Sequence, residues 1–204
     1  FYFILGCRRQ MPPSFAERAI YEIISDELGE EAEAMNYLRR PDNNRLNVEP
    51  LELKNSLRRT QKVFLKQLAK RFELASRSFD LETFTSTGIP KMQEEYVATV
   101  YNLDSMHWKD DFGEDFFQWT IDTFGNIHED CPHFLFFFVI YLNDFQDEPL
   151  NAEQQKIVES VERLVQKNTS ACSVLTGLTP VEKRDVQNWI DYLGEHNSTK
   201  IDEV

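Results

Sequence analysis

The sequence predicts an α/β domain in which helices flank a parallel β-sheet and make up much of the chain. Residues 1–5 and 134–142 are continuous apolar runs, typical of strands that are buried on both faces of a sheet. Much of the segment between these runs has the apolar spacing of amphipathic helices. A further short strand is expected near Cys172. Strands that alternate with helices along a chain favour a parallel sheet with helices on its faces.

The chain opens with a strand, a loop and a helix. FYFIL is followed by a loop, because Pro12 and Pro13 fit neither a strand ladder nor a helix interior. Ser14 is a good N-cap, and Glu17 three residues later completes a capping box. Apolar residues at helical spacing then predict a helix over residues 15–28.

The remaining elements follow from the same periodicities. A long helix is expected over residues 50–72, with apolar residues along one side and basic residues along the other. Charged residues alternate with apolar residues at helical spacing over residues 151–166, which predicts another helix there. Helices are expected over about residues 30–39, 50–72, from 92 onward, 112–124, 151–166 and 181–193. The strongest strand is expected over 134–142 and a short one over 171–175.

Composition bounds the class of protein. The chain has 204 residues, of which 41% are hydrophobic and 13% aromatic, which suffices for one substantial core. We expect one domain over residues 1–193 and a polar tail over residues 194–204. No apolar window reaches the roughly 18 residues that a membrane helix needs, and three scattered cysteines form no disulfide framework. A reducing cytoplasm fits best, and an opening residue other than Met suggests a piece of a longer chain.

Charge is distributed unevenly along the sequence. Residues 1–77 hold 14 Lys and Arg against 11 Asp and Glu, whereas residues 78–204 hold 8 against 24. A surface as acidic as the second part repels phosphate backbones, so nucleic acid is not an expected partner there. The acidic part is expected to be a solvated face, and the alternative is a surface for a basic partner.

The loop after the first strand occupies the position of a phosphate-binding loop. Backbone amides at a helix N-terminus bind phosphates in such loops, whose pattern is G-x-x-x-x-G-K-[ST]. Gly6 is present, but Met11, Pro12 and Pro13 replace the second glycine, the lysine and the hydroxyl residue, and Ser14 comes one place late. The loop therefore lacks the phosphate-binding cation, and its two prolines lack amide donors. We expect no nucleotide hydrolysis and no cofactor.

Two alternatives at this site stay open. Arg8 and Arg9 are expected to be solvated, although both could attract an anion, and an atypical loop could still bind nucleotide. The strand over residues 134–142 is followed by Asn143 and Asp144. This arrangement resembles the strand of P-loop enzymes whose acidic residue holds the Mg²⁺ shell. Without the upstream lysine this is a poor metal site, and a strand-ending turn is the simpler interpretation.

Other chemistries fit the sequence less well. Cys7 begins the loop as in cysteine phosphatases, but Pro13 stands where the anion-holding arginine is needed. His128, Cys131 and His133 lie close together, yet three candidates in a turn without a partnering cluster do not predict a zinc site. No G-x-S-x-G elbow is present. We expect no metal and no catalytic residue.

The order of these features resembles the inactive STAND domains, which are P-loop NTPase relatives from bacterial conflict and signalling proteins. The resemblance covers residues 1 to about 193 and is carried by the following segments: FYFILG, SFAERAIYEII, KVFLKQLAKRF, MHWKDDFGEDFFQWTIDTFG, HFLFFFVIYLND and CSVLTGLTPVEKRDVQNWIDYL. It implies a P-loop NTPase-like sheet and a cytoplasmic pseudo-NTPase that regulates through protein contacts. Such modules are typically fused to small adaptor domains that recruit effectors, and no catalytic residues are implied.

The sequence is therefore compatible with three functions. The first is a non-catalytic signalling module of a bacterial defence system, and the second is a nucleotide-binding or nucleotide-hydrolysing switch with an atypical loop. The third is a helical adaptor in which the strands matter little. For protein contacts we expect a basic helix face to meet an acidic partner or the acidic half of the chain; its residues are Lys54, Arg58, Arg59, Lys62 and Lys66.

Overall fold

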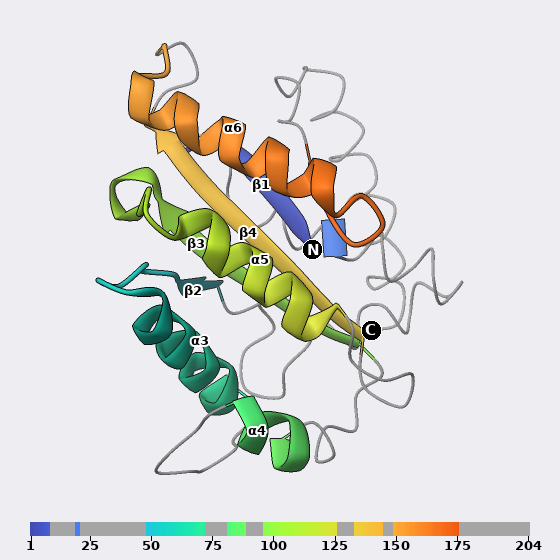
Figure 1. The fold of residues 1–204 in the computed structure, drawn as a ribbon. Helices are drawn as coiled ribbons and strands as arrows, with labels where there is room; N and C mark the ends of the chain where they lie inside the picture. The colour runs from blue at the N-terminus through green and yellow to red at the C-terminus, as the bar shows by residue number, and fades with distance from the viewer. Residues whose placement is uncertain are drawn as a thin grey trace, which may run out of the picture.

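The computed structural model describes residues 1–8, 19–20, 48–71, 81–88, 96–125, 133–144 and 149–175. These residues form a five-stranded sheet in the order β2-β3-β4-β1-β5, and every neighbouring pair of strands is parallel (Figure 1). The strands are β1 (Tyr2–Cys7), β2 (Val48–Pro50), β3 (Tyr96–Asp104), β4 (His133–Asn143) and β5 (Ser173–Leu175). The predicted α/β class is confirmed, and the parallel sheet differs from the purely helical fold that the adaptor alternative implied.

Helices connect the strands in sequence. They are α3 (Leu57–Arg71), α4 (Leu81–Thr83) with the π-helical turn Phe84–Gly88, the 3₁₀ turn Ser105–His107, α5 (Gly113–Phe124) and α6 (Ala152–Lys167). α3, α5 and α6 lie together on one face of the sheet (Figure 1). This follows from right-handed crossovers, because β2, β3 and β4 are each followed by a strand that lies further in the same direction across the sheet.

β1 and β4 lie side by side, but the chain leaves them in opposite directions. From β1 it passes to β2 at the far edge, beyond β4 and β3, and from β4 it passes to β5 on the other side of β1. Residues 19–20, within the first of these connections, are helical. Such a reversal is a topological switch point, and open α/β sheets bind ligands beyond the carboxyl ends of the strands there.

The continuous apolar run of β4 reflects burial on both faces of the sheet. Its even-numbered residues from Phe134 to Leu142 belong to the core beneath α3, α5 and α6, whereas Phe137 and Val139 are buried on the opposite face. β1 behaves in the same way, with Phe3 in the main core. Side chains alternate between faces along a strand, so only a central strand needs apolar residues at every position.

Aromatic rings fill the core between the sheet and the three helices. Phe64 of α3 is fully buried and contacts Tyr101 at 4.9 Å, Phe116 at 5.5 Å and Phe136 at 5.8 Å between ring centroids. Trp108 stacks on Phe117 at 5.7 Å. Such pairs add about 0.5–1.5 kcal/mol each beyond the burial of their area. Trp108 belongs to this core, and the partly buried Trp119 packs against it.

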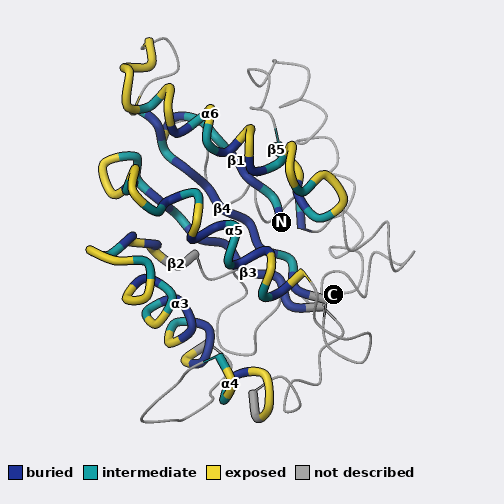
Figure 2. The backbone as a smooth tube through the Cα atoms, viewed as in Figure 1, coloured by how far each residue is buried: buried dark blue, intermediate teal, exposed yellow. Residues whose placement is uncertain are grey.

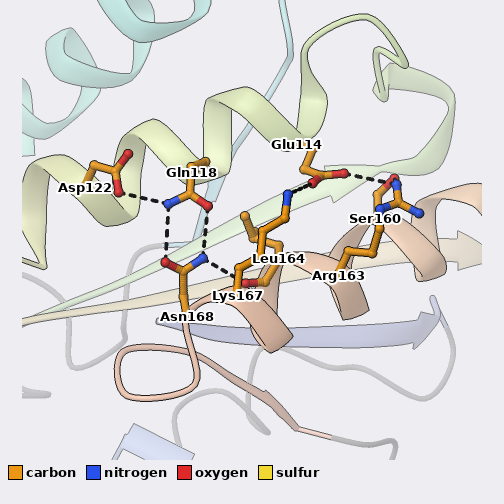
Figure 3. A network of polar contacts seen from close by, with 8 residues as sticks. All are labelled: Glu114, Gln118, Asp122, Ser160, Arg163, Leu164, Lys167 and Asn168. Carbon is orange, nitrogen blue, oxygen red and sulfur yellow. Dashed lines mark hydrogen bonds and ion pairs between the residues drawn. The ribbon is translucent and has the colours of Figure 1, made fainter.

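α5 and α6 are joined by polar contacts as well as by the core (Figure 3). Glu114 accepts hydrogen bonds from Arg163 at 3.0 Å and from Lys167 at 2.9 Å. The amides of Gln118 and Asn168 hydrogen-bond reciprocally, at 3.3 and 3.0 Å. These contacts fix α6, and therefore its N-terminus, relative to the carboxyl edge of the sheet.

One predicted helix begins later than expected, and one stretch that the sequence predicts as helix is a strand. Residues 48–50 form β2 and α3 begins only at Leu57, whereas the prediction places one helix over 50–72. Tyr96–Asp104 is β3, although a helical pattern is expected from residue 92. This stretch is rich in β-branched and aromatic residues, which favour strands. β2 is a short edge strand, where proline is tolerated because its missing N–H faces no partner.

The other elements agree with prediction where they are described. α5 and α6 lie within one residue of the predicted ranges, and β4 contains the predicted strand. Among the described helices, none is long and apolar enough to cross a membrane. Most of the helix predicted over 15–28, the helices predicted over 30–39 and 181–193, and the tail over 194–204 lie outside the described residues.

Candidate functional site

A depression of about 600 Å³ opens at the carboxyl edge of the sheet, beside the switch point between β1 and β4. It is lined by the residues that end these strands and β3, by the 3₁₀ turn and by the first turn of α6: Arg8, Asp104, Met106, Tyr141, Leu142, Asn143, Asp144 and Gln154. Its place in the topology and its convergent polar groups make it the candidate functional site.

Arg8 is the central side chain of this site. Its backbone N–H donates to the carbonyl of Asn143 at 3.0 Å, immediately after a register shift between Gly6 and Cys7. Its guanidinium is ion-paired with Asp104 and lies 3.4 Å from Asp144, measured from Nε to Oδ1. The guanidinium carbon lies 5.3 Å from the centroid of the Tyr141 ring, which is within cation–π range. Arg8 therefore joins the carboxyl ends of β1, β3 and β4.

Asp104 is held on its other side by the backbone. One carboxylate oxygen accepts from the N–H of Met106 at 3.1 Å, which caps the 3₁₀ turn. In the same turn, the Ser105 hydroxyl donates to the carbonyl of Leu142 at 3.1 Å and so ties β3 to β4. The Asp104 side chain is only 17% exposed, whereas that of Asp144 is 68% exposed. The Arg8–Asp104 pair is thus the better shielded of the two contacts.

The N-terminus of α6 borders the site, but its own side chains occupy its amide donors. Asn151 Oδ1 accepts from the N–H groups of Glu153 at 3.0 Å and Gln154 at 2.9 Å. The Gln154 side-chain oxygen accepts from the Asn151 N–H at 2.8 Å, and its side-chain N–H₂ donates to the carbonyl of Leu142. This capping box satisfies the donors that would otherwise be available to an anion.

The described residues give the site a net negative charge, because it contains the two carboxylates of Asp104 and Asp144 and only one guanidinium, that of Arg8. Burial raises the pKa of the Tyr141 hydroxyl above its ordinary value, although Arg8 and a hydrogen bond with Asn102 act in the opposite direction. Tyr141 is therefore neutral at physiological pH and contributes its ring to the site.

The structure brings together only part of the predicted phosphate site. Gly6 lies in β1 and Arg8 follows it, while Asn143 and Asp144 end β4 at the same edge. Arg9, Pro12, Pro13 and Ser14 lie outside the described residues. Arg8 is not simply solvated, because its guanidinium contacts two carboxylates and an aromatic ring.

Sequence reasoning missed Asp104 and Tyr141. Asp104 follows an apolar run that alternates with polar residues, and a strand prediction there would have placed its carboxylate at the ligand-binding edge. Within the described ranges, no group of three or more His, Cys, Asp and Glu side chains could hold a metal ion. His128 and Cys131 lie outside these ranges, and His133 begins β4 at the end of the strand away from the site.

Four of the five residues of the predicted basic face lie on α3, and Lys54 does not. Arg58, Arg59, Lys62 and Lys66 are exposed, and Lys54 instead pairs with Glu52 in the turn that precedes the helix. Lys70 is exposed as well and extends the face. In the described part of the chain, none of the four predicted helix residues makes an ion pair.

Comparison of the chain with models of known protein families, with curated proteins and with solved structures finds no match. Its function therefore has to be inferred from the fold and the two sites described above.

Proposed function

We propose that this chain is a non-catalytic regulatory module with the architecture of a P-loop NTPase, of the inactive STAND type, which acts through protein contacts. The observation that carries the proposal is the neutralisation of Arg8 by Asp104 and Asp144 where a nucleotide phosphate would bind. The resemblance further suggests a cytoplasmic signalling protein of a bacterial defence system, in which this module contacts effectors or fused adaptor domains.

A polyphosphate at this edge would meet unfavourable electrostatics. To reach Arg8 it must displace two carboxylates, and it then leaves those carboxylates beside its own negative charge. Like charges at ion-pair distance repel by about 1 kcal/mol in water and by more in a partly buried site. No lysine follows in the loop to offset this cost, because Pro12 stands at its position in the sequence.

Backbone donors are also scarce among the described residues at this edge, and the two prolines of the loop add none. Phosphate loops bind mainly through a series of N–H groups at a helix N-terminus. Here the Arg8 N–H donates to Asn143, the first-turn donors of α6 serve their own capping box, and Pro12 and Pro13 carry no N–H. Nucleotide binding is therefore weakened in two ways: the phosphates find fewer cations to pair with and fewer backbone N–H groups to accept hydrogen bonds from.

A second candidate is a nucleotide-binding switch with an atypical loop. It is favoured by the position of the depression at the switch point, where α/β proteins bind nucleotides, and by two carboxylates at strand ends, where Mg²⁺ could be held. Arg8 is 53% exposed and could in principle turn toward a ligand.

Calorimetric titration with Mg-ATP and with Mg-GTP distinguishes the two. The non-catalytic module gives no saturable heat with nucleotide at about a hundredfold above a typical micromolar Kd. Binding in the micromolar range that Arg8→Ala abolishes would instead establish the switch. Arg163→Ala is the matched control, because Arg163 is equally exposed and ion-paired but lies between α5 and α6.

A further inference from the structure

The outer side of α3 carries positive charge that no acidic side chain of the described residues compensates. The helix sequence LRRTQKVFLKQLAKR contains six Lys and Arg and no Asp or Glu, in a chain whose net charge is −13. Arg58, Arg59, Lys62, Lys66 and Lys70 are exposed, and within the described ranges they form no ion pair. We call these five residues the α3 basic stripe.

The stripe has a regular geometry because the other side of the helix is fixed in the core. Phe64 and Leu68 are fully buried, and Figure 2 shows α3 with a buried inner side and an exposed outer side. Residues four apart lie one above the other on a helix, at intervals of about 6 Å. Arg58, Lys62, Lys66 and Lys70 therefore form a row about 18 Å long.

The basic residues of the stripe are unfavourable for the stability of the helix itself. Arg58 and Arg59 lie in the first turn of α3, which has no acidic residue, so their charges oppose the helix dipole. Neighbouring lysines at i, i+4 also repel one another. Residues that break a local rule without an internal compensation are characteristic of functional surfaces.

We propose that the α3 basic stripe binds an acidic segment, rich in Glu and Asp, of a partner protein. The inference rests on the proposed function and names the chemistry of its partner. Acidic side chains recur about every 6 Å along one side of a helix, or at every second residue of an extended peptide, so either conformation matches the row of cations. Lys54 is not part of this surface, because Glu52 already neutralises it.

Because the whole chain is negatively charged, it repels large anions more strongly than a short acidic segment that contacts only α3. At physiological salt, interactions are screened beyond about 8 Å, so a peptide seated on α3 senses mainly the stripe. A long nucleic acid, or a second copy with the same net charge of −13, would also meet the acidic remainder of the surface. A peptide segment fits without that repulsion.

The test uses a fluorescein-labelled peptide of ten glutamates and fluorescence anisotropy. We expect saturable binding at about 50 mM salt that is lost near 0.5 M, where the screening length falls to about 4 Å. Arg58→Glu combined with Arg59→Glu should weaken binding by at least about tenfold, since it replaces two attractions by two repulsions. The matched control is Lys109→Glu with Lys156→Glu, which changes net charge equally on other elements and should leave the affinity within about twofold.

Stability provides the second measurement. Glutamates in the first turn of a helix interact favourably with its dipole, so the Arg58→Glu, Arg59→Glu variant should melt at or above the temperature of the unchanged protein. Weaker binding in a folded, equally stable variant then assigns the loss to the stripe.

Four results would overturn the proposal. They are absence of binding at low salt, equal loss in both double variants, tighter binding of a ten-nucleotide oligo-dT than of the peptide, and a stripe-dependent dimer in sedimentation. Each outcome is separate from the nucleotide titration, since that experiment probes Arg8 at the switch point and this one probes α3. Failure of either leaves the result of the other interpretable.

Discussion

Arg8 follows β1 and Asp104 ends β3, 96 residues later along the chain; the two strands are not neighbours in the sheet, yet these side chains form an ion pair. β4 lies between β1 and β3, so the Arg8 side chain reaches over the end of β4 and packs on its Tyr141 ring. The pair thereby closes the carboxyl edge at the point where a parallel α/β sheet ordinarily accepts a ligand.

The Arg8–Asp104 pair should be measurably coupled. In a double-mutant cycle with Arg8→Met and Asp104→Asn, we expect a coupling free energy of about 0.5–1.5 kcal/mol, because one partner is largely shielded from solvent. Urea unfolding of the four proteins gives this value. The same cycle with Asp144→Asn should give a smaller coupling, since Asp144 is 68% exposed. Equal couplings, or none, would contradict the geometry described here.

Thr99 should be a site where a less polar residue stabilises the protein. Its side chain is fully buried in β3, and its hydroxyl has no hydrogen-bond partner in the part of the chain that the structure describes. Thr99→Val removes this unsatisfied group at constant shape and should raise the free energy of unfolding by about 1 kcal/mol.

Thr60→Val is the control for that substitution. The equally buried Thr60 hydroxyl donates to the carbonyl of Ser56 at 3.1 Å and accepts from the N–H of Lys54 at 2.8 Å. Its removal should lower the free energy of unfolding by about 1 kcal/mol or more. Changes of the same sign in the two variants would show that Thr99 is satisfied in solution.

Gly113 should not tolerate alanine. A Cβ at this position would lie 2.7 Å from the Trp108 ring, and this ring is stacked on Phe117 within the core. Trp108 must therefore move, which should cost about 1–3 kcal/mol as in other overpacked sites. The thermal midpoint should fall, and the near-ultraviolet circular dichroism of the tryptophans should change. A variant with unchanged spectrum and midpoint would place Trp108 elsewhere.

Glu114 should make stability depend on pH. A hydrogen bond from Lys167 holds the pKa of Glu114 below its ordinary value, and Arg163 acts in the same direction. Because the folded pKa is depressed, the stabilisation is complete above the unfolded pKa of about 4.3 and is lost as pH falls through the folded value.

Unfolding of Glu114→Gln measures this contribution. The variant should be less stable than the unchanged protein by about 0.5–1 kcal/mol at pH 7, and the difference should shrink as pH falls below about 4. Glu159→Gln is the control, since Glu159 is exposed on α6 without an ion pair among the described residues. A difference that grows toward acid would have the wrong sign.

The sequence predicted β1, β4 and the short edge strand β5, and it missed β2 and β3. β1 and β4 were predictable because strands buried on both faces leave continuous apolar runs. β2 has three residues and includes a proline, so it carries too little pattern to be separated from the helix that follows. The β3 strand has the required residue types, but the polar stretch before it favoured a helix and concealed the role of Asp104.

The candidate site was predictable only in part, because some of its features are local in the sequence and others depend on how the strands are arranged. The ends of the two apolar runs, at residues 5 and 142, are local features of the sequence, and they located Arg8, Asn143 and Asp144 near the ends of β1 and β4. The ion pair between Arg8 and Asp104 depends on strand order, which periodicity does not determine. The basic face of α3 was predictable from spacing alone, whereas the neutralisation of Lys54 by Glu52 required coordinates.

The neutralisation of Arg8 is tested most directly by removing the two carboxylates and measuring the affinity for inorganic tripolyphosphate by calorimetry. If Asp104 and Asp144 keep phosphate away from Arg8, the unchanged protein should not bind measurably, and Asp104→Asn with Asp144→Asn should bind at least about tenfold more tightly. Adding Arg8→Ala to that variant should abolish the gain. Micromolar binding by the unchanged protein, or no gain in the double variant, would contradict this account.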